Sequence, residues 1–245
     1  MTLSSKYWLK SCAGYIKLLH NPQEYPSPYS VMMIPTLKEL VKKYTQKNDS
    51  LIDIGCGEGF FTREIKKIRP NISGYDISAE MIVAAKEKNS HIHYQQLDIE
   101  KSNLQISKST YNLAISSLVF HYLEKIDSAL KNIHHLLVDQ GYLIVTIPHP
   151  CFYHPENFDW FQNENNQDYQ LGKYFNEGVT IRNIAKSFKT HHIHRTIGSY
   201  VRTFSKNKFE VVDILEPRSK NKTNQTLTKA DNIPFMAIFV LQKKA

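Results

Sequence analysis

The stretch Leu51–Phe61 constrains the fold of this chain more than any other segment. Its sequence, LIDIGCGEGFF, places a short strand before a turn that holds Gly55, Gly57 and Gly59, and residues 60–68 then read as a helix. Glycine lets the main chain approach a ligand where any Cβ would collide, and a helix start presents free backbone N–H groups. The sequence therefore predicts a ligand at a strand-to-helix turn.

The glycine spacing narrows the class of ligand. A dinucleotide-binding turn needs a small third residue in G-x-G-x-x-G or G-x-G-x-x-A, whereas Phe60 occupies that position here. The sequence also has no G-x-x-x-x-G-K-[ST] loop for a nucleoside triphosphate. Both departures disfavour a nicotinamide-dependent oxidoreductase and a nucleoside triphosphatase.

Strand and helix patterns alternate from Leu51 onward. This rhythm predicts an α/β fold with a doubly wound, seven-stranded, mostly parallel sheet, helices on both faces and an antiparallel edge. At 245 residues, a single domain over residues 1–245 is expected. The expected strands are 51–54, 72–76, 92–97, 111–117, 142–147, 209–215 and 234–242, and the expected helices are 60–68, 79–88, 126–138 and 197–207.

Two segments lie outside this alternation. Residues 1–47 predict an N-terminal helical cap, with helices near 4–19 and 35–47 and with Pro35 at a first helical position. Residues 148–194 have no regular pattern and hold many aromatic side chains among polar ones. Long irregular segments are usually functional or disordered, and aromatic content argues against disorder. We expect a lid over a substrate pocket, with an insertion that packs on the sheet as the alternative.

Acidic side chains follow three of the expected strands, where open parallel sheets bind their ligands. Asp53 ends the first strand, Asp76 ends the second, and Asp98 follows the third. Asp76 is placed to accept hydrogen bonds from ribose hydroxyls, because Ser78 is the better N-cap for the next helix. Asp98 can accept from an adenine amino group or belong to a plain turn. Apolar walls for such a ring are expected from Ile77, Leu97 and Ile99.

The segment DIGCGEG at residues 53–59 resembles the first motif of the class I S-adenosylmethionine-dependent methyltransferases. Later segments look like further motifs of that family and of its small-molecule branch. The resemblance covers about residues 51–245, with one departure, since Asp139-Gln140-Gly141 stands where the family usually has Pro-Gly-Gly. The segments concerned are 116–122, 141–145, His149-Pro150, HRTI at 194–197 with Tyr200, and Glu216-Pro217.

The resemblance implies a Rossmann-like methyltransferase fold and S-adenosyl-L-methionine as the cofactor, released as S-adenosyl-L-homocysteine. The glycine turn would hold the amino-acid part of the cofactor. The expected reaction is transfer of a methyl group to a small molecule by in-line displacement. The expected cofactor-binding residues are Asp53, Gly55, Cys56, Gly57, Gly59, Asp76, Ile77, Met81, Asp98, Ile99, Ser116 and Ser117.

A neutral acceptor must lose a proton during methyl transfer, and histidine suits that role near neutral pH. His149, after the fifth strand, is the first candidate for a catalytic base, and His121, after the fourth, is the second. His149 can instead shape a turn between two prolines, His121 can be a packed residue, and a carboxylate acceptor needs no base. The expected substrate-binding side chains are Tyr29, Tyr122, Phe152, Tyr153, Trp160 and Tyr200.

The formal net charge of +8 leaves RNA or protein as an alternative acceptor. The lysines are spread over helices and no nucleic-acid-binding motif occurs, so a solvated basic face is the simpler interpretation. Three cysteines without clustered spacing disfavour a disulfide framework and a zinc site. We expect a cytoplasmic protein, a monomer or homodimer, with no metal and no membrane contact. A non-catalytic homologue that keeps the cofactor pocket is a further alternative.

Overall fold

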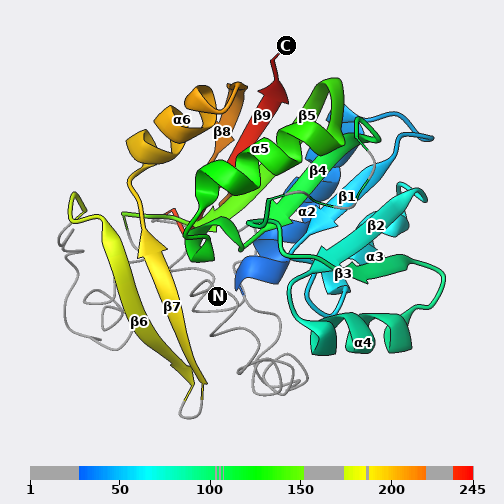
Figure 1. Ribbon diagram of the computed structural model, residues 1–245, viewed down its shortest axis with the longest axis horizontal. Helices are drawn as coiled ribbons and strands as arrows, with labels where there is room; N and C mark the ends of the chain where they lie inside the picture. The colour runs from blue at the N-terminus through cyan, green and yellow to red at the C-terminus, as the bar shows by residue number, and fades with distance from the viewer. Residues whose placement is uncertain are drawn as a thin grey trace.

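A seven-stranded sheet forms the centre of the computed structural model, which describes residues 28–102, 104, 106, 108–151, 174–185, 188–218 and 234–244 (Figure 1). Its strands are β1 (Leu51–Ile54), β2 (Ile72–Asp76), β3 (His93–Gln96), β4 (Tyr111–Ser117), β5 (Leu137–Pro148), β8 (Phe209–Leu215) and β9 (Met236–Lys243). The helices are α2 (Pro28–Tyr44), α3 (Phe60–Lys66), α4 (Ala79–Lys88), the 3-10 helix η1 (Phe120–Tyr122), α5 (Ile126–Leu136) and α6 (Ile197–Lys206).

The strand order is β3-β2-β1-β4-β5-β9-β8, so the direction of winding reverses between β1 and β4. β1 pairs in parallel with both β2 and β4, and β4 pairs in parallel with β5. β9 runs antiparallel to β5 and to β8. The predicted α/β fold with a mostly parallel sheet and an antiparallel edge is confirmed. Open α/β sheets bind ligands at such a reversal, so the carboxyl ends of β1 and β4 are the expected ligand position, called the crevice below.

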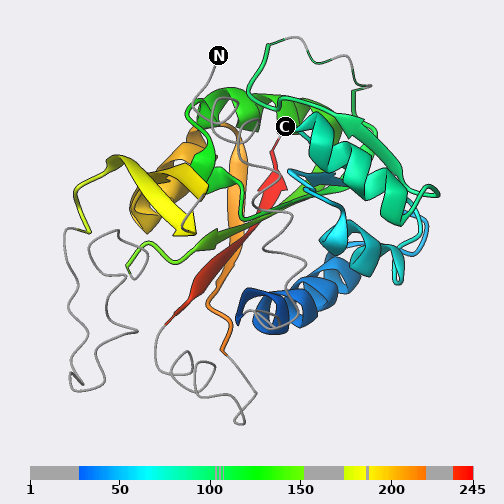
Figure 2. The ribbon, with the colours of Figure 1, turned by 90° about the horizontal axis from the view of Figure 1, so that it is seen from below.

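Helices cover both faces of the sheet (Figure 2). α5 and α6 pack on one face, and α2 and α3 pack on the other. Alternate residues of a strand point to opposite faces. Leu51 and Ile115 therefore belong to the cluster on the α2–α3 face, while Ile52 and Ala114 belong to the cluster on the α5–α6 face. This alternation shows, for each strand residue near the crevice, which of the two faces its side chain lies on.

Helix α2 begins at Pro28, seven residues before the position expected from the sequence, so that Pro35 lies inside the helix. Proline removes one backbone hydrogen bond from a helix. The burial of Met32, Met33 and Leu37 against the sheet overrides that preference. The helix expected over residues 4–19 lies outside the described residues. None of the described helices is both long and apolar enough to cross a membrane.

Strand β5 begins at Leu137, and α5 ends at Leu136, so the expected turn at 139–141 lies within the strand. The register with β4 shifts between Tyr111 and Leu113, which marks a bulge. Gln140 has a φ of 62° in this irregular stretch. Leu136 and Leu137 are both fully buried. Because a buried apolar pair satisfies a helical and an extended pattern equally, the sequence did not locate the boundary.

Residues 178–194 form an antiparallel hairpin of β6 (Gly178–Ala185) and β7 (Phe188–His194), where the sequence predicted irregular structure. That prediction is wrong for these residues. The buried positions of β7 include Thr190, His191, His192 and His194, so polar residues hide the usual strand pattern. Residues 152–173, with the expected substrate residues Phe152, Tyr153 and Trp160, lie outside the described residues.

We predict that Phe239→Ala strongly destabilises the fold. Phe239 is fully buried on β9, with its ring centroid 5.2 Å from that of Phe204 and 5.9 Å from that of Tyr200. Truncating such a side chain costs about 3–5 kcal/mol of unfolding free energy. Val212→Ala, on the exposed side of β8, is the matched control and should change stability by about 0.5 kcal/mol or less. Equal effects of the two changes in urea denaturation would contradict this assignment of the core.

Candidate functional site

The turn between β1 and α3 is built from three glycines with positive φ. The φ angles of Gly55, Gly57 and Gly59 are 76°, 55° and 78°. A Cβ at Gly55 would lie 2.3 Å from the Cγ2 of Val119, and its left-handed backbone would strain any other residue. The turn therefore depends on glycine and leaves a stretch of bare backbone at the crevice.

The carboxylate of Asp76 links this turn to α4. Its Oδ2 accepts a hydrogen bond of 2.8 Å from Gly57 N, and its Oδ1 accepts one of 2.9 Å from Ser78 N. Burial raises the pKa of Asp76, while these backbone hydrogen bonds oppose the shift. Ser78 Oγ caps α4 by accepting from Met81 N at 3.2 Å. The cap is thus supplied by Ser78, as the sequence predicted.

Asp53 is a second buried carboxyl group on the same face of the sheet. It is 1% exposed, and its Oδ2 accepts a hydrogen bond of 2.6 Å from Thr62 Oγ1 in α3. Burial raises the pKa of Asp53 to about 7, and the charge of Asp76 adds to the shift. Asp53 is therefore poised between its neutral and charged forms at neutral pH, so a nearby cation would favour the charged form.

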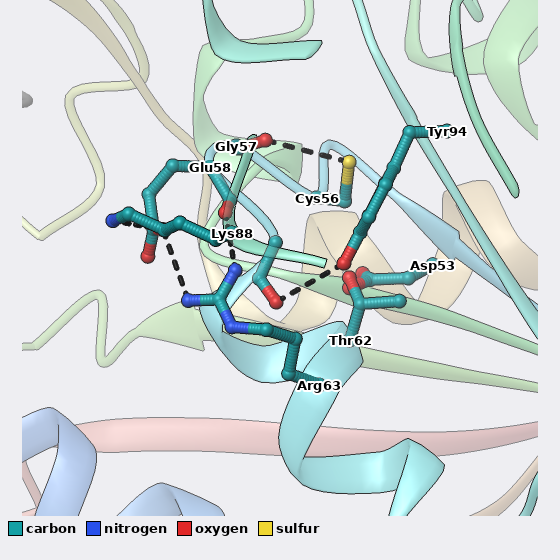
Figure 3. Close-up of polar contacts among 9 residues, drawn as sticks. Asp53, Cys56, Gly57, Glu58, Thr62, Arg63, Lys88 and Tyr94 are labelled. Atoms are coloured by element: carbon teal, nitrogen blue, oxygen red, sulfur yellow. Dashed lines mark hydrogen bonds and ion pairs between the residues drawn. The ribbon is translucent and has the colours of Figure 1, made fainter. Parts of the chain in front are cut away.

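An ion-pair network holds the outer side of the turn (Figure 3). Glu58 Oε2 lies 3.0 Å from Arg63 Nη2 in α3 and 2.5 Å from Lys88 Nζ in α4. The Tyr94 hydroxyl donates to Gly59 O at 3.4 Å. No role for Glu58 or Thr62 was predicted from the sequence. The only feature of the sequence that could have pointed to these two residues is their position within or just after the glycine motif.

Most of the remaining expected cofactor residues are buried, and Asp98 belongs to a turn. Cys56 is buried, and burial raises the pKa of its thiol, so the sulfur stays protonated. Asp98 Oδ1 accepts from Glu100 N at 3.0 Å, which is the turn role considered above. Ile99 is buried in the α5–α6 cluster. Met81 is buried in α4, and Ile77 is half-buried before it.

Ser116 and Ser117 end β4 with their side chains on opposite faces. Ser116 Oγ donates to Ile54 O at 3.1 Å. Ser117 follows the parity of Ile115 and so lies on the α2–α3 face. The next residue, Leu118, has a φ of 59° and donates its N–H to Thr146 O at 2.9 Å. This bond fixes the end of β4 against β5.

His149, the first candidate base, lies just beyond β5 and has partners at both ring nitrogens. Its Nε2 lies 2.8 Å from Glu216 Oε1, and its Nδ1 accepts from Cys151 N at 3.3 Å. Because a carboxylate only accepts, Nε2 carries the proton. Burial lowers the pKa of His149, and Glu216 opposes that shift. The ring is therefore a neutral imidazole oriented by a carboxylate. The sequence motif contained Glu216 but did not indicate this contact.

His121 and Tyr122 lie in η1 beneath the hairpin. The His121 ring centroid is 4.0 Å from that of Tyr122 and 5.1 Å from that of His192. His191 Nε2 donates to Tyr122 O at 2.5 Å, and burial lowers the pKa of His191. The structure thus places His121 in a buried ring cluster.

Tyr200 and Tyr29, two further expected substrate residues, lie in different parts of the fold. Tyr200 is 1% exposed, and burial raises the pKa of its hydroxyl to about 12. It packs with Phe204 and Phe239 in the α5–α6 cluster. The backbone of Tyr29 lies in the first turn of α2, and its side chain is outside the described part of the structure.

Comparisons with known proteins agree with this geometry. A protein-family model described as a methyltransferase domain matches residues 52–143. A candidate S-adenosylmethionine-dependent methyltransferase from Listeria monocytogenes has a TM-score of 0.73 and 26% identity over 87% of this chain and 99% of that one. The chain is an S-adenosylmethionine-dependent methyltransferase. A second methyltransferase structure, from Mesorhizobium loti, has the same fold, with a TM-score of 0.72 and 20% identity over 89% of this chain and 99% of that one.

Two sequence relatives match this methyltransferase over most of their length. A protein of unassigned function from Haemophilus influenzae is 29% identical over 217 residues, which are 83% of this chain and 82% of the relative. A malonyl-[acyl-carrier protein] O-methyltransferase from Bacillus anthracis is 22% identical over 219 residues, which are 86% of this chain and 80% of the relative.

The crevice of this methyltransferase fits S-adenosylmethionine chemically. No heavy atom lies within 4 Å of the Cβ position of Gly57, so the backbone of the turn is open there. The Asp76 carboxyl group has four lone pairs, which its backbone hydrogen bonds do not use up, so it can also accept from a ribose hydroxyl. Asp53 offers a titratable carboxyl group suited to a positively charged cofactor.

We predict that Asp53→Asn makes the cofactor-free enzyme more stable at pH 8 than the wild type. The folded pKa of Asp53 is raised, so its stabilising effect is full below about pH 4 and is lost as the pH rises through about 7. The stability difference between variant and wild type should grow by about 2 kcal/mol from pH 5 to pH 8. Cofactor affinity at pH 8 should fall about tenfold, because a charge–charge attraction is removed.

Thermal unfolding and isothermal titration with S-adenosylmethionine measure the two effects. Thr62→Val is the matched control, since it removes the hydrogen bond to the same carboxyl group and keeps its charge. A stability difference that is equal at pH 5 and pH 8 would show that Asp53 does not titrate in this range.

Proposed function

We propose that this methyltransferase transfers a methyl group to a small-molecule acceptor, either free or attached to a carrier, by in-line displacement. The observation that carries the proposal is the polar set on one face at the carboxyl ends of β1, β2 and β4, which is formed by Asp53, Asp76 and Ser117 beside the glycine turn. The name of the Bacillus anthracis relative, a malonyl-[acyl-carrier protein] O-methyltransferase, supports a small or carrier-bound acceptor.

The proposed donor site uses backbone and carboxylate groups. The open backbone at Gly57 leaves room for the amino-acid part of the cofactor, and Asp76 binds the ribose. Ile77 and Met81 provide apolar contacts for the adenine ring of the cofactor. The bound cofactor supplies an electrophilic methyl carbon on a positively charged sulfur. Holding an acceptor in line with that carbon contributes up to about 7–11 kcal/mol to lowering the barrier.

The acceptor then lies over the ends of β4 and β5, because the donor occupies the ends of β1 and β2. We propose residues 148–194 as its cover. This segment leaves β5 at His149, and its last strand, β7, contacts η1 through His191 and Tyr122. A cover that excludes water removes the solvent shell of the attacking atom.

His149 is proposed as the general base for an acceptor that arrives protonated. Glu216 holds Nε2–H, so Nδ1 is the nitrogen available to take a proton once the acceptor displaces the 3.3 Å contact with Cys151 N. A neutral ring near pH 7 suits this role. His121 in its ring cluster is the second candidate, and an ionised carboxylate acceptor would need neither.

Labelled methyl transfer tests the proposal. Purified enzyme and methyl-labelled S-adenosylmethionine are incubated with malonyl-acyl carrier protein and with panels of small carboxylic acids, phenols and amines. We expect label in a small or carrier-bound product. Asp76→Ala should bind the cofactor at least about tenfold more weakly, because it removes the support of the Gly57 amide. Label found only in RNA or on protein side chains would overturn the acceptor class.

We predict that His149→Gln lowers kcat by about 100-fold or more on a protonated acceptor, which is the usual contribution of a general base. Glu216→Gln should lower kcat about tenfold. It should also move the acidic limb of the pH–rate profile to lower pH, because Glu216 raises the pKa of His149. His91→Gln, on an exposed turn, is the control and should leave kcat unchanged. An unchanged kcat for His149→Gln on such an acceptor would exclude the base role.

A further inference from the structure

Two hydroxyl groups lie side by side at the end of the central strands. Ser117 of β4 and Thr146 of β5 are paired in parallel register. They follow the parity of Ile115 and Ile144, so both side chains lie on the α2–α3 face. Strand spacing places their side chains about 5 Å apart. Ser117 Oγ and Thr146 Oγ1 are both buried, and neither has a hydrogen-bond partner in the part of the chain that the structure describes.

Nearby buried hydroxyls behave differently. Ser116 Oγ donates to Ile54 O, and Thr62 Oγ1 donates to Asp53. An unpaired buried hydroxyl destabilises the folded state, and native proteins retain few of them. Two such groups in one register pair therefore indicate a site that a polar group completes.

The position of the pair matches the acceptor side of the proposed reaction. Asp53 lies on the same face of β1, which neighbours β4, so Ser117 is one strand away from the donor site and Thr146 is two strands away. On the far side, Thr146 pairs with Ile238 of β9, and Met236 shares the parity of Ile238. Both belong to the apolar α2–α3 cluster. Methionine is flexible and repacks readily around a ligand.

We propose that Ser117 and Thr146 bind an uncharged oxygen atom of the methyl acceptor, such as a carbonyl or hydroxyl oxygen. This inference rests on the proposed function and assigns Ser117 to the acceptor instead of the cofactor. One oxygen between two hydroxyls about 5 Å apart forms both hydrogen bonds at normal length. The neutral hydroxyls and apolar surroundings favour an uncharged group, because a buried charge without a counter-charge is far more costly.

The first arm of the test measures stability and needs no acceptor. Thr146→Val keeps the shape of the side chain and removes the hydroxyl. We expect the melting temperature of the cofactor-free enzyme to stay equal or rise by up to about 4 °C, because an unpaired polar group is lost. Ser116→Ala is the matched control and should lower it by about 2–4 °C, because its hydroxyl is bonded. A fall for Thr146→Val as large as that for Ser116→Ala would overturn the proposal.

The second arm measures binding of malonyl-acyl carrier protein, which has a thioester carbonyl, to enzyme saturated with S-adenosylhomocysteine. We expect Ser117→Ala and Thr146→Val each to weaken this binding about 3- to 10-fold and to leave the cofactor dissociation constant unchanged. Unchanged acceptor binding, or a loss confined to the cofactor, would overturn the proposal. If the wild type binds the probe without methylating it and the variants lose binding, the proposed reaction fails and the hydroxyl site stands.

Discussion

The hydrogen bonds of the Asp76 carboxylate to two backbone amides are the contacts on which the rest of the site depends. One oxygen holds the Gly57 amide of the turn after β1, and the other holds the Ser78 amide at the start of α4. A single side chain at the end of β2 thus fixes two backbone segments. Because the carboxyl group is buried, its negative charge depends on these bonds. Loss of that charge would loosen the turn and the helix start together.

The polar groups of the candidate site lie on one face of the sheet. Asp53, Asp76, Ser117 and Thr146 all follow the parity of the α2–α3 face, since strand residues alternate between faces. The α5–α6 face holds an apolar core that includes Tyr200. Burying unpaired or titrating groups on one face is costly. The apolar cores on both faces offset this cost, so the fold tolerates unpaired polar groups at the candidate site.

The sequence predicted the parts of the structure that local patterns encode. Buried parallel strands are short apolar runs, so β1, β2 and β4 were located to the residue. The glycine turn and Asp76 lie at the ends of two consecutive strands, so the sequence alone was enough to propose the donor side. The contact of His149 with Glu216 joins residues 67 positions apart, and the pairing of Ser117 with Thr146 depends on register. Buried polar residues in β7 hid the alternating pattern by which a strand is recognised. In α2, burial against the sheet outweighed the preference of Pro35 for a helix start.

The donor and acceptor sides of the enzyme are therefore held by different kinds of contact. The donor side is fixed by backbone amides and glycine geometry, which a change of side chain elsewhere hardly alters. The acceptor side is assembled by side chains from distant segments. Arg195 donates to Phe120 O at 3.3 Å and to Leu123 O at 2.6 Å, and it fastens the end of the hairpin to η1. The family match over residues 52–143 covers the donor side and stops within β5. The proposed acceptor residues therefore lie on both sides of that boundary, with Ser117 and His121 inside the match and Thr146 and His149 beyond it.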